Sequence, residues 1–370
     1  MNIIKKLIGF LVLLILGLIV FLYFYINIPS VRDGEIIGRI KFPQNNNVFK
    51  FPTNIVPLPP IINWLKPESI RKYSNSNDFL KDHGVIGFLV LHKDTIVYEN
   101  YFNGFEKGDI TQIFSVTKAL VTPLLGLAID NGYVQSMQQP VSDFLPNLPP
   151  TANYKALTLY HLAQMQSGID QDEYGDLFKT LKFYFDKNVK DQVKKSYFKF
   201  KPGDKFVYKS IDTQLLGECL EVATGDSFLN LFYRNIWSKL GIEDDSYWSI
   251  DSKKFKNPKM YGGLNASLPD LAKFCSMYMH DGEFRGEQVI PKKWVNFCDN
   301  TLERKGADQY CMGWWMDMDD DKQNIYYGAG FNGQVMFINE TTQTAIIKIG
   351  EGKGGVNWYS ILKRLSNAYN

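Results

Sequence analysis

Ser115 and Lys118 stand three positions apart, a spacing that can make a nucleophile without histidine. Residues three apart on a helix share one face, so we expect the lysine amine to lie beside the serine hydroxyl. A serine hydroxyl is a poor nucleophile until a neighbouring base takes its proton. The pair therefore suggests a serine that is activated by lysine.

The surrounding sequence distinguishes this pair from chance matches. Residues 69–72 and 196–199 also fit Ser-x-x-Lys, but only Ser115 is followed by a long apolar run, residues 119–130. A helix that is apolar on all sides is buried. We expect Ser115 in the first turn of this central helix, where free N–H groups and the positive dipole end favour developing negative charge. Pro123 is expected to kink or tighten the helix.

Tyr208 is a second group that can move a proton. Lysine and tyrosine have ordinary pKa values of about 10.4 and 10, so both are mostly protonated at neutral pH. Burial lowers the pKa of a lysine, and a nearby lysinium stabilises tyrosinate, so the two groups can share the role of base. Tyr208 is expected to end a short strand over residues 205–207, next to a helix that starts near Asp212 and ends at Gly225.

Composition excludes several classes of protein. The 370 residues are 45% hydrophobic and 15% aromatic, which is enough for one sizeable catalytic domain or two small ones. The net charge of +2 comes without a sustained basic run, so nucleic acid is not an expected partner. The four histidines have no ligand-like spacing, and we predict neither a metal nor a cofactor. Cys219 falls on an apolar helical face, whereas a disulfide among Cys275, Cys298 and Cys311 is left open because sequence cannot pair them.

The amino-terminal segment carries a separate signal. Lys5 and Lys6 precede an uncharged run of 20 residues, 7–26, which as a helix would be about 30 Å long and match a bilayer core. A cleavable signal peptide is the alternative, but its apolar region is usually shorter and ends in small residues. This run ends in aromatic residues, so an uncleaved anchor is favoured. The lysines ahead of it predict a cytoplasmic tail and an outward-facing catalytic domain.

The chain is therefore expected to have three parts. Residues 1–28 form a transmembrane anchor, residues 29–75 a stalk rich in Pro and Asn that lies over the domain, and residues 76–370 the catalytic domain. Strand patterns occur near both ends of that domain, with helical patterns between them. The expected strands cover residues 84–91, 95–101, 325–330, 333–339 and 343–349, and a final amphipathic helix covers 356–369. The predicted fold class is α+β, with one antiparallel sheet built from both chain ends, flanking helices and a mainly helical inserted region.

Three segments in this order resemble the serine β-lactamase and penicillin-binding superfamily, in particular the class C-like branch that includes esterases and 6-aminohexanoate-dimer hydrolases. The branch pattern is Ser-x-x-Lys, then Tyr-x-Asn or Tyr-x-Ser, then a Lys-Thr-Gly-like triplet on a strand beside the site. The matching segments are Ser115-Val116-Thr117-Lys118, Tyr208-Lys209-Ser210 and Gly328-Ala329-Gly330. The resemblance spans about residues 76–365, and its specificity comes from the ordered set.

The resemblance implies a two-step hydrolysis through a covalent intermediate. Ser115 would attack a carbonyl, Lys118 and Tyr208 would act as general base and acid, and water would then clear the acyl-enzyme. The backbone N–H groups of Ser115 and Phe331 would hold the oxyanion. Further candidates for contact with the substrate are Ser210, Gly328, Ala329, Gly330 and Asn332, although Ser210 could be a helix cap and Asn332 could simply shape its loop.

Two departures from the pattern narrow the substrate. Gly328 stands where the triplet carries lysine, so the cation that grips the carboxylate of β-lactams and D-alanyl peptides is missing. Ser210 replaces the asparagine typical of β-lactamases. Both changes favour a small ester or linear amide substrate. Together with the amino-terminal segment, the sequence predicts an enzyme anchored in a bacterial inner membrane, with its catalytic domain on the periplasmic side.

Other functions remain as alternatives. A peptidoglycan D,D-carboxypeptidase or β-lactamase would use the same chemistry. A non-catalytic penicillin-binding-like sensor belongs to another class, and the six residues ahead of the apolar run argue against it. A histidine-triad hydrolase is disfavoured because no Gly-x-Ser-x-Gly elbow occurs. The oligomeric state is left open. The aromatic residues Trp314, Trp315, Tyr326 and Tyr327 either wall an acyl pocket or form aromatic core.

Overall fold

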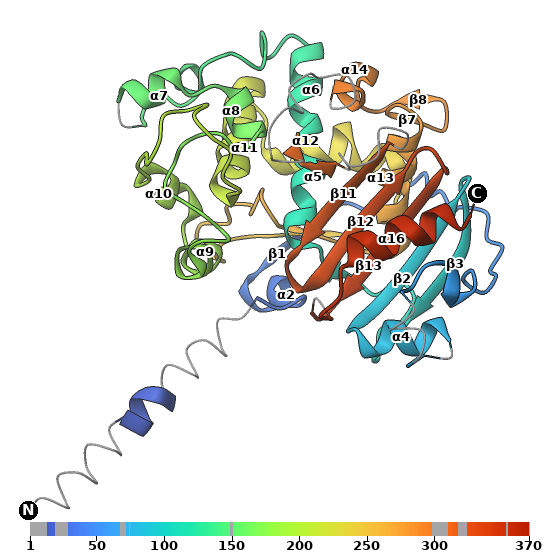
Figure 1. Cartoon of the computed structure of the whole chain (residues 1–370). Helices are drawn as coiled ribbons and strands as arrows, with labels where there is room; N and C mark the ends of the chain where they lie inside the picture. The colour runs from blue at the N-terminus through green and yellow to red at the C-terminus, as the bar shows by residue number, and fades with distance from the viewer. Residues whose placement is uncertain are drawn as a thin grey trace, which may run out of the picture.

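A seven-stranded antiparallel sheet forms the central layer of the computed structural model, in the order β3-β2-β13-β12-β11-β10-β9 (Figure 1). Residues 13–18, 29–66, 72–73, 75–148, 151–297, 310–316, 324–352 and 354–369 are described. The strands are β2 (Val85–His92), β3 (Thr95–Tyr101), β9 (Tyr310–Cys311), β10 (Trp314–Met316), β11 (Ile325–Gly330), β12 (Gln334–Asn339) and β13 (Thr344–Gly350). Because β2 pairs with β13, the sheet is built from both ends of the catalytic region, and the predicted α+β fold is confirmed.

The sheet is buried on both faces, which explains its nearly continuous apolar strands. Successive side chains of a strand point to opposite faces. In β12, Met336 and Ile338 join the main core, while Val335 and Phe337 join a second core on the other face. Helix α13 (Leu268–Met279) belongs to the main core. Helices α4 (Ser76–Asp82) and α16 (Trp358–Asn367) cover the second core.

A helical region lies beside the sheet, between β4 (Thr111–Gln112) and the last strands (Figure 1). Its helices are α5 (Thr117–Val121), α6 (Pro123–Asp130), α7 (Ala152–Ala156), α8 (Leu159–Ala163), α9 (Leu177–Tyr184), α10 (Val189–Lys194), α11 (Ser210–Thr224) and α12 (Phe228–Asn235). Helix α14 (Lys292–Val295) and the hairpin of β7 (Glu283–Phe284) and β8 (Glu287–Gln288) follow α13. Pro123 separates α5 from α6, as a helix-interior proline is expected to do. Helix α11 ends at Gly225 in the left-handed conformation.

A second, smaller sheet was not predicted. It consists of β1 (Arg39–Lys41), β5 (Tyr247–Ser249), β6 (Leu264–Ala266) and β4 (Thr111–Gln112), in that order. Strands of two or three residues are too short to show an alternating pattern. The sheet draws the amino-terminal segment onto the domain, since β1 pairs with β5 and the preceding helix α2 (Asp33–Ile37) carries the buried Asp33. The boundaries of the stalk and the domain stay predictions.

The predicted transmembrane helix over residues 7–26 lies outside the described residues, apart from residues 13–18, which are helical. Within the part of the chain that the structure describes, no helix combines the length and the apolar character that crossing a bilayer requires. The anchor therefore stays a prediction.

Both sheets contact the turn that carries Ser115. β4 leads directly into the 3-10 turn η2 (Phe114–Val116), and α5 begins at Thr117. Ser115 therefore precedes the α-helix and does not lie in its first turn, which corrects the prediction. On the other side, β11 lies so close that a Cβ atom on Gly330 would stand 2.5 Å from the Ile113 carbonyl oxygen. Glycine at this position lets the strand pack against the nucleophile's turn.

This close approach predicts different effects for two glycine substitutions. Gly330→Ala places its new methyl group against backbone, so we expect a loss of about 1–3 kcal/mol in the free energy of unfolding and a loss of hydrolysis. Gly328→Ala is the matched control, because the nearest atom to its Cβ would be a side-chain carbon of Val116, at 3.2 Å, and the nearest backbone atom would be 3.6 Å away. Chemical denaturation of both variants measures the difference. Equal stability of the two variants would show that β11 is not held against the turn as described.

Candidate active site

The structure brings Ser115, Lys118 and Tyr208 together. Lys118 Nζ lies 2.8 Å from Ser115 Oγ, in hydrogen-bond contact. The Tyr208 side chain also hydrogen-bonds that of Ser115, and Lys118 Nζ stands 4.9 Å from the centre of the Tyr208 ring. Two groups able to exchange a proton thus flank one hydroxyl. Their catalytic roles stay predictions.

Lys118 is fully buried and surrounded by oxygen atoms. Besides Ser115 Oγ, its amine donates to Ser210 Oγ at 3.1 Å and to the Tyr261 carbonyl at 3.2 Å. Burial penalises the charged form and lowers the pKa of Lys118, while the carboxylate of Glu173 acts against this shift. The environment therefore favours a neutral amine, which can accept a proton.

Tyr208 is held by aromatic side chains. Its ring stacks on Tyr174, with ring centres 5.5 Å apart, and on Trp315, also at 5.5 Å. The ring of Tyr310 meets it edge-on at 5.7 Å. Burial raises the pKa of Tyr208 well above its ordinary value, and the charge of Glu173 adds to this effect. The phenol is therefore protonated at neutral pH, in contrast to the tyrosinate considered from the sequence.

Buried contacts fix the segment that presents Tyr208. Lys209 donates to the Ile169 carbonyl at 2.9 Å, and Asp212 accepts from the hydroxyl of Ser167 at 2.5 Å. Burial raises the pKa of Asp212 to about 6. The predicted strand over residues 205–207 is wrong, because these residues belong to no strand. Isolated backbone bonds hold the segment, from Val207 N–H to the carbonyl of Met165 and from Glu173 N–H to that of Tyr208.

The turn after β11 forms another wall of the site. Phe331 begins it, directly after the triplet of Gly328, Ala329 and Gly330. The Asn332 amide donates to the Pro29 carbonyl at 2.9 Å, and Lys348 donates to the Gly333 carbonyl at 2.6 Å. Burial lowers the pKa of Lys348 to about 7. The Asn332 side chain thus bonds the chain itself, and its contact with substrate stays a prediction, as do those of Ser210, Phe331 and the triplet.

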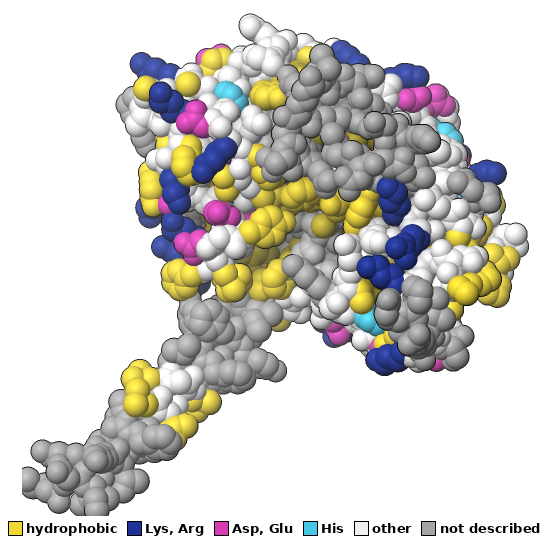
Figure 2. Space-filling model, in the orientation of Figure 1, with side chains coloured by type: hydrophobic (Ala, Val, Ile, Leu, Met, Phe, Trp, Pro, Cys, Tyr) yellow, Lys and Arg dark blue, Asp and Glu magenta, His cyan; other side chains and the backbone are white. Residues whose placement is uncertain are grey.

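A small cavity of about 70 Å³ opens beside Ser115. Its lining includes Ser210, Tyr261, Phe331 and Glu173. One carboxylate oxygen of Glu173 is buried without a hydrogen-bond partner among the described residues. Sequence reasoning missed Glu173, which belongs to no motif, and it missed the Tyr261 carbonyl, because a backbone acceptor leaves no mark in the sequence. Figure 2 shows hydrophobic side chains gathered across the hollowed middle of the face on this side.

Only part of the predicted aromatic wall lies at the site. Trp315 stacks on Tyr208 and on Tyr327. Trp314 and Tyr326 are fully buried and pack with each other and with Tyr278, so they are core.

The cysteines that the structure describes differ in their oxidation state. Cys219 and Cys275 are free and buried, whereas Cys311 is disulfide-bonded. The sequence does not decide which of Cys275, Cys298 and Cys311 form a disulfide. Because Cys275 is free, it does not take part in such a bond. Burial raises the pKa of both free thiols, so neither is a reactive thiolate at neutral pH.

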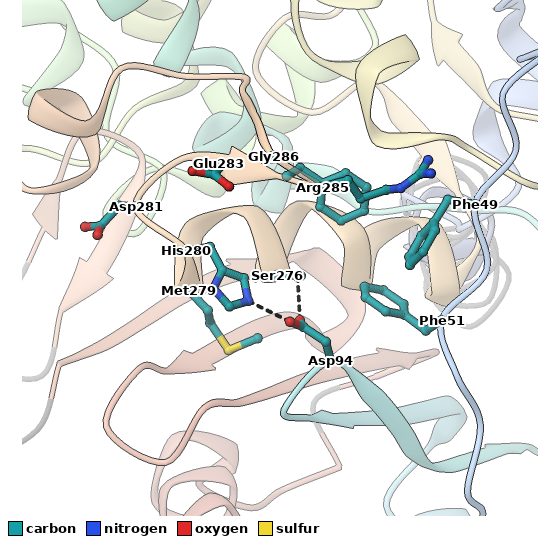
Figure 3. A pocket seen from close by; sticks show the side chains of 11 residues that line it. Phe49, Phe51, Asp94, Ser276, Met279, His280, Asp281, Glu283, Arg285 and Gly286 are labelled. Carbon is teal, nitrogen blue, oxygen red and sulfur yellow. Dashed lines mark hydrogen bonds and ion pairs between the residues drawn. The ribbon is translucent and has the colours of Figure 1, made fainter.

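A second, larger cavity of about 460 Å³ contains a serine, a histidine and an aspartate (Figure 3). The Asp94 carboxylate accepts from Ser276 Oγ at 2.7 Å and contacts His280 Nε2 at 2.7 Å. In a catalytic triad the histidine stands between the serine and the acid. Here the carboxylate stands in the middle, so the serine has no base and this cluster is not a second hydrolase centre.

The beta-lactamase family model matches residues 77–355, the segment that contains every side chain of this site except Pro29. The chain belongs to the beta-lactamase family. The 6-aminohexanoate-dimer hydrolase of Paenarthrobacter ureafaciens is 25% identical over 286 residues, 71% of each chain. The D-alanyl-D-alanine-carboxypeptidase/endopeptidase AmpH of Escherichia coli (strain K12) is 28% identical over 142 residues, 37% of each chain.

Comparison with a solved structure shows that the fold is similar as well. A protein named as a 6-aminohexanoate-dimer hydrolase, from Bacillus anthracis, matches with a TM-score of 0.79 at 20% identity. The match covers 93% of this chain and 92% of that one. The resemblance read from the three sequence segments is thereby confirmed at the level of the family and the fold.

The charge of Glu173 predicts a change in the pH dependence of activity. Its carboxylate stabilises the ammonium form of Lys118, so Glu173→Gln lowers the pKa of Lys118 further. The neutral amine is then present at lower pH, and the acid limb of the kcat/KM profile shifts to lower pH. Asp172→Asn is the matched control, since that neighbouring carboxylate accepts from the N–H of Gly175 and does not act on Lys118. A shift toward higher pH, or equal shifts in both variants, would contradict this electrostatic role.

Proposed function

We propose that this serine hydrolase of the beta-lactamase family cleaves small ester or linear amide bonds through an acyl-enzyme on Ser115. The observation that carries the proposal is the 2.8 Å contact between the Ser115 hydroxyl and the buried amine of Lys118. A desolvated lysine can take the proton that the serine must lose. The 6-aminohexanoate-dimer hydrolases among the relatives support an amide or ester substrate.

In the proposed mechanism, neutral Lys118 accepts the proton of Ser115 as the oxygen attacks the carbonyl carbon. The backbone N–H groups of Ser115 and Phe331 hold the oxygen that becomes negative. Tyr208 stays protonated in the resting enzyme. It gives its proton to the leaving group and recovers one from Lys118, since both contact the Ser115 oxygen. Water then attacks the acyl-enzyme, with the same groups working in reverse.

The lining of the cavity supports a substrate without a free carboxylate near the reacting bond. Among the described residues, those that line the cavity include no lysine or arginine, and they include the carboxylate of Glu173. Position 328 supplies no cation, because glycine stands there. β-Lactams and D-alanyl peptides carry a carboxylate that such a cation would bind. A D,D-carboxypeptidase or β-lactamase activity is therefore the less favoured alternative.

We also propose that residues 7–26 anchor the protein in a membrane, with the catalytic domain on the periplasmic side. The length and apolar character of the run support this location. The disulfide at Cys311 supports an oxidising compartment, because disulfides are rare in proteins that stay in the cytosol.

A comparison of substrates tests the proposed reaction. The full-length protein in detergent is offered p-nitrophenyl acetate, the 6-aminohexanoate dimer, nitrocefin and a D-alanyl-D-alanine peptide. We expect turnover of the first or second substrate and little of the other two. Faster turnover of nitrocefin or the peptide would favour the alternative activity, and acylation without turnover of any substrate would favour the sensor. Ser115→Ala is the control, and unchanged hydrolysis in that variant would remove Ser115 as the nucleophile.

Substitution of the two proposed proton-transfer groups gives a second prediction, on the rate of hydrolysis. Lys118→Ala and Tyr208→Phe are each expected to lower kcat by about a hundredfold or more, the usual size of a general acid–base contribution. Tyr208→Phe keeps the aromatic packing, so circular dichroism and thermal melting should match the parent protein. A variant that keeps its rate within a few-fold would show that its residue does not carry the proton.

A further inference from the structure

The catalytic cavity is joined to the amino-terminal segment. Pro29 lines the cavity together with Ser115 and Phe331. Its carbonyl oxygen accepts from the amide of Asn332, in the same turn that presents Phe331. Pro29 stands three residues after Ile26, where the apolar run ends. Three residues of fully extended chain reach at most about 10 Å, so the cavity lies within about that distance of the end of the run.

The described part of the apolar run has no partner in the domain. Its helical residues Leu13, Leu14, Ile15, Leu16 and Leu18 are all about half exposed or more. Apolar side chains that are exposed one after another along a helix are usually covered by a membrane or by another molecule. A bilayer core is the partner that fits, because the whole run of 20 uncharged residues matches its thickness.

The rim of the cavity is apolar as well. Tyr174, Leu177 and Phe178 follow one another around the start of α9, and their exposed fractions are 73%, 57% and 59%. Phe331, which also lines the cavity, is 40% exposed, and Ile36 on α2 is 74% exposed. Figure 2 shows hydrophobic side chains gathered in the middle of one face of the molecule.

Helix α9 has the character of an element at a lipid surface. Phe178 and Lys182 stand four residues apart, so they share a face of the helix, and both are exposed. A lysine beside an aromatic side chain suits the boundary between headgroups and acyl chains, where the ring is inserted and the amine reaches the polar layer. The headgroup layer is about 5–8 Å thick on each side of the core, which lies within the reach set by Pro29.

The size of the cavity adds a constraint on the substrate. A volume of about 70 Å³ is well below the roughly 300–1,000 Å³ of typical ligand pockets. The reacting carbonyl and a few neighbouring atoms fill such a space. The rest of a larger substrate must lie across the apolar rim.

We infer that the mouth of the cavity works against a membrane surface and that the enzyme takes an amphiphilic ester or amide whose apolar chain comes from the lipid layer. This inference rests on the proposed hydrolase function and on the proposed anchor. It adds the source of the substrate and the surface that receives it.

Contact with lipid is measured first, without turnover. The full-length protein carries Phe178→Cys with a polarity-sensitive fluorophore and is placed in vesicles of phosphatidylcholine and phosphatidylglycerol. Val222→Cys on α11 is the matched control, because Val222 is 53% exposed and does not belong to the rim. The buried Cys219 and Cys275 are expected to stay unlabelled.

The label at position 178 should shift to the blue in vesicles and be shielded from an aqueous quencher, and the label at 222 should not. An unshifted label at 178 would overturn the inference. A shift that follows protein concentration in detergent, without lipid, would mean that a second copy covers the rim and would also overturn it.

Substrate choice is measured next, with 4-methylumbelliferyl acetate in solution and 4-methylumbelliferyl oleate in the same vesicles. The double variant Ile36→Ser/Phe178→Ser removes exposed apolar side chains that do not line the cavity. We expect it to lose about tenfold or more on the oleate, because two insertable side chains are gone, and to stay near the parent rate on the acetate. Val222→Ser is expected to match the parent protein on both.

Failure of the membrane inference can be distinguished from failure of the proposed hydrolase function. If the parent protein hydrolyses the acetate but the double variant keeps its full rate on the oleate, the inference falls and the proposed hydrolase stands. If the parent protein hydrolyses neither ester and the 6-aminohexanoate dimer is also untouched, the proposed function itself falls, and the inference falls with it.

Discussion

The hydrogen bonds of one buried amine join the parts of the candidate active site. Lys118 Nζ contacts oxygen atoms from three separate parts of the chain, namely Ser115, Ser210 and the Tyr261 carbonyl. Burying an amine costs free energy unless it finds such partners, and burying it as a cation costs more. The surrounding fold therefore has to supply all three oxygens at once. If η2, α11 or the loop at Tyr261 moved away, the buried amine would lose one of its three partners.

The surrounding strands and turns meet this requirement through several contacts. The short sheet brings β4, and with it η2, beside β6. The large sheet presents β11 through glycines, so backbone packs against backbone. In the turn that follows, Asn332 bonds the Pro29 carbonyl, and Lys348 bonds the Gly333 carbonyl. Several of these contacts join residues that are far apart in sequence, such as Asn332 and Pro29.

The sequence predicted the parts of this arrangement that have a local signature. Strands β2, β3, β11, β12 and β13 are long enough for their apolar runs and turns to be recognised, and their observed bounds differ from the predicted ones by one residue at most at each end. Ser115, Lys118 and Tyr208 were found because their types and order form a motif. These three do lie together, and the family match supports the same fold.

Features that arise only from the three-dimensional fold could not be predicted. The strands of the small sheet are two or three residues long, and their pairing joins residues 39–41 to residues 247–249. Glu173 acts on Lys118 and Tyr208 through space, from a loop with no recognisable pattern. The strand expected at residues 205–207 has the right side chains but no neighbouring strand, so local propensity was overridden by tertiary contacts. Likewise, the aromatic stack around Tyr208 decides its protonation, and its members come from distant segments.

The order in which the chain is made has a consequence for when the protein becomes active. β2 is synthesised early, but its partner β13 follows much later, with His92 and Thr344 in contact across 252 residues of sequence. The turn that begins at Phe331 also belongs to this last stretch. A polypeptide still emerging from the ribosome thus carries Ser115 and Lys118 without the wall that would hold a reacting carbonyl. The pocket around Ser115 is therefore complete only after the last strands of the large sheet have been made.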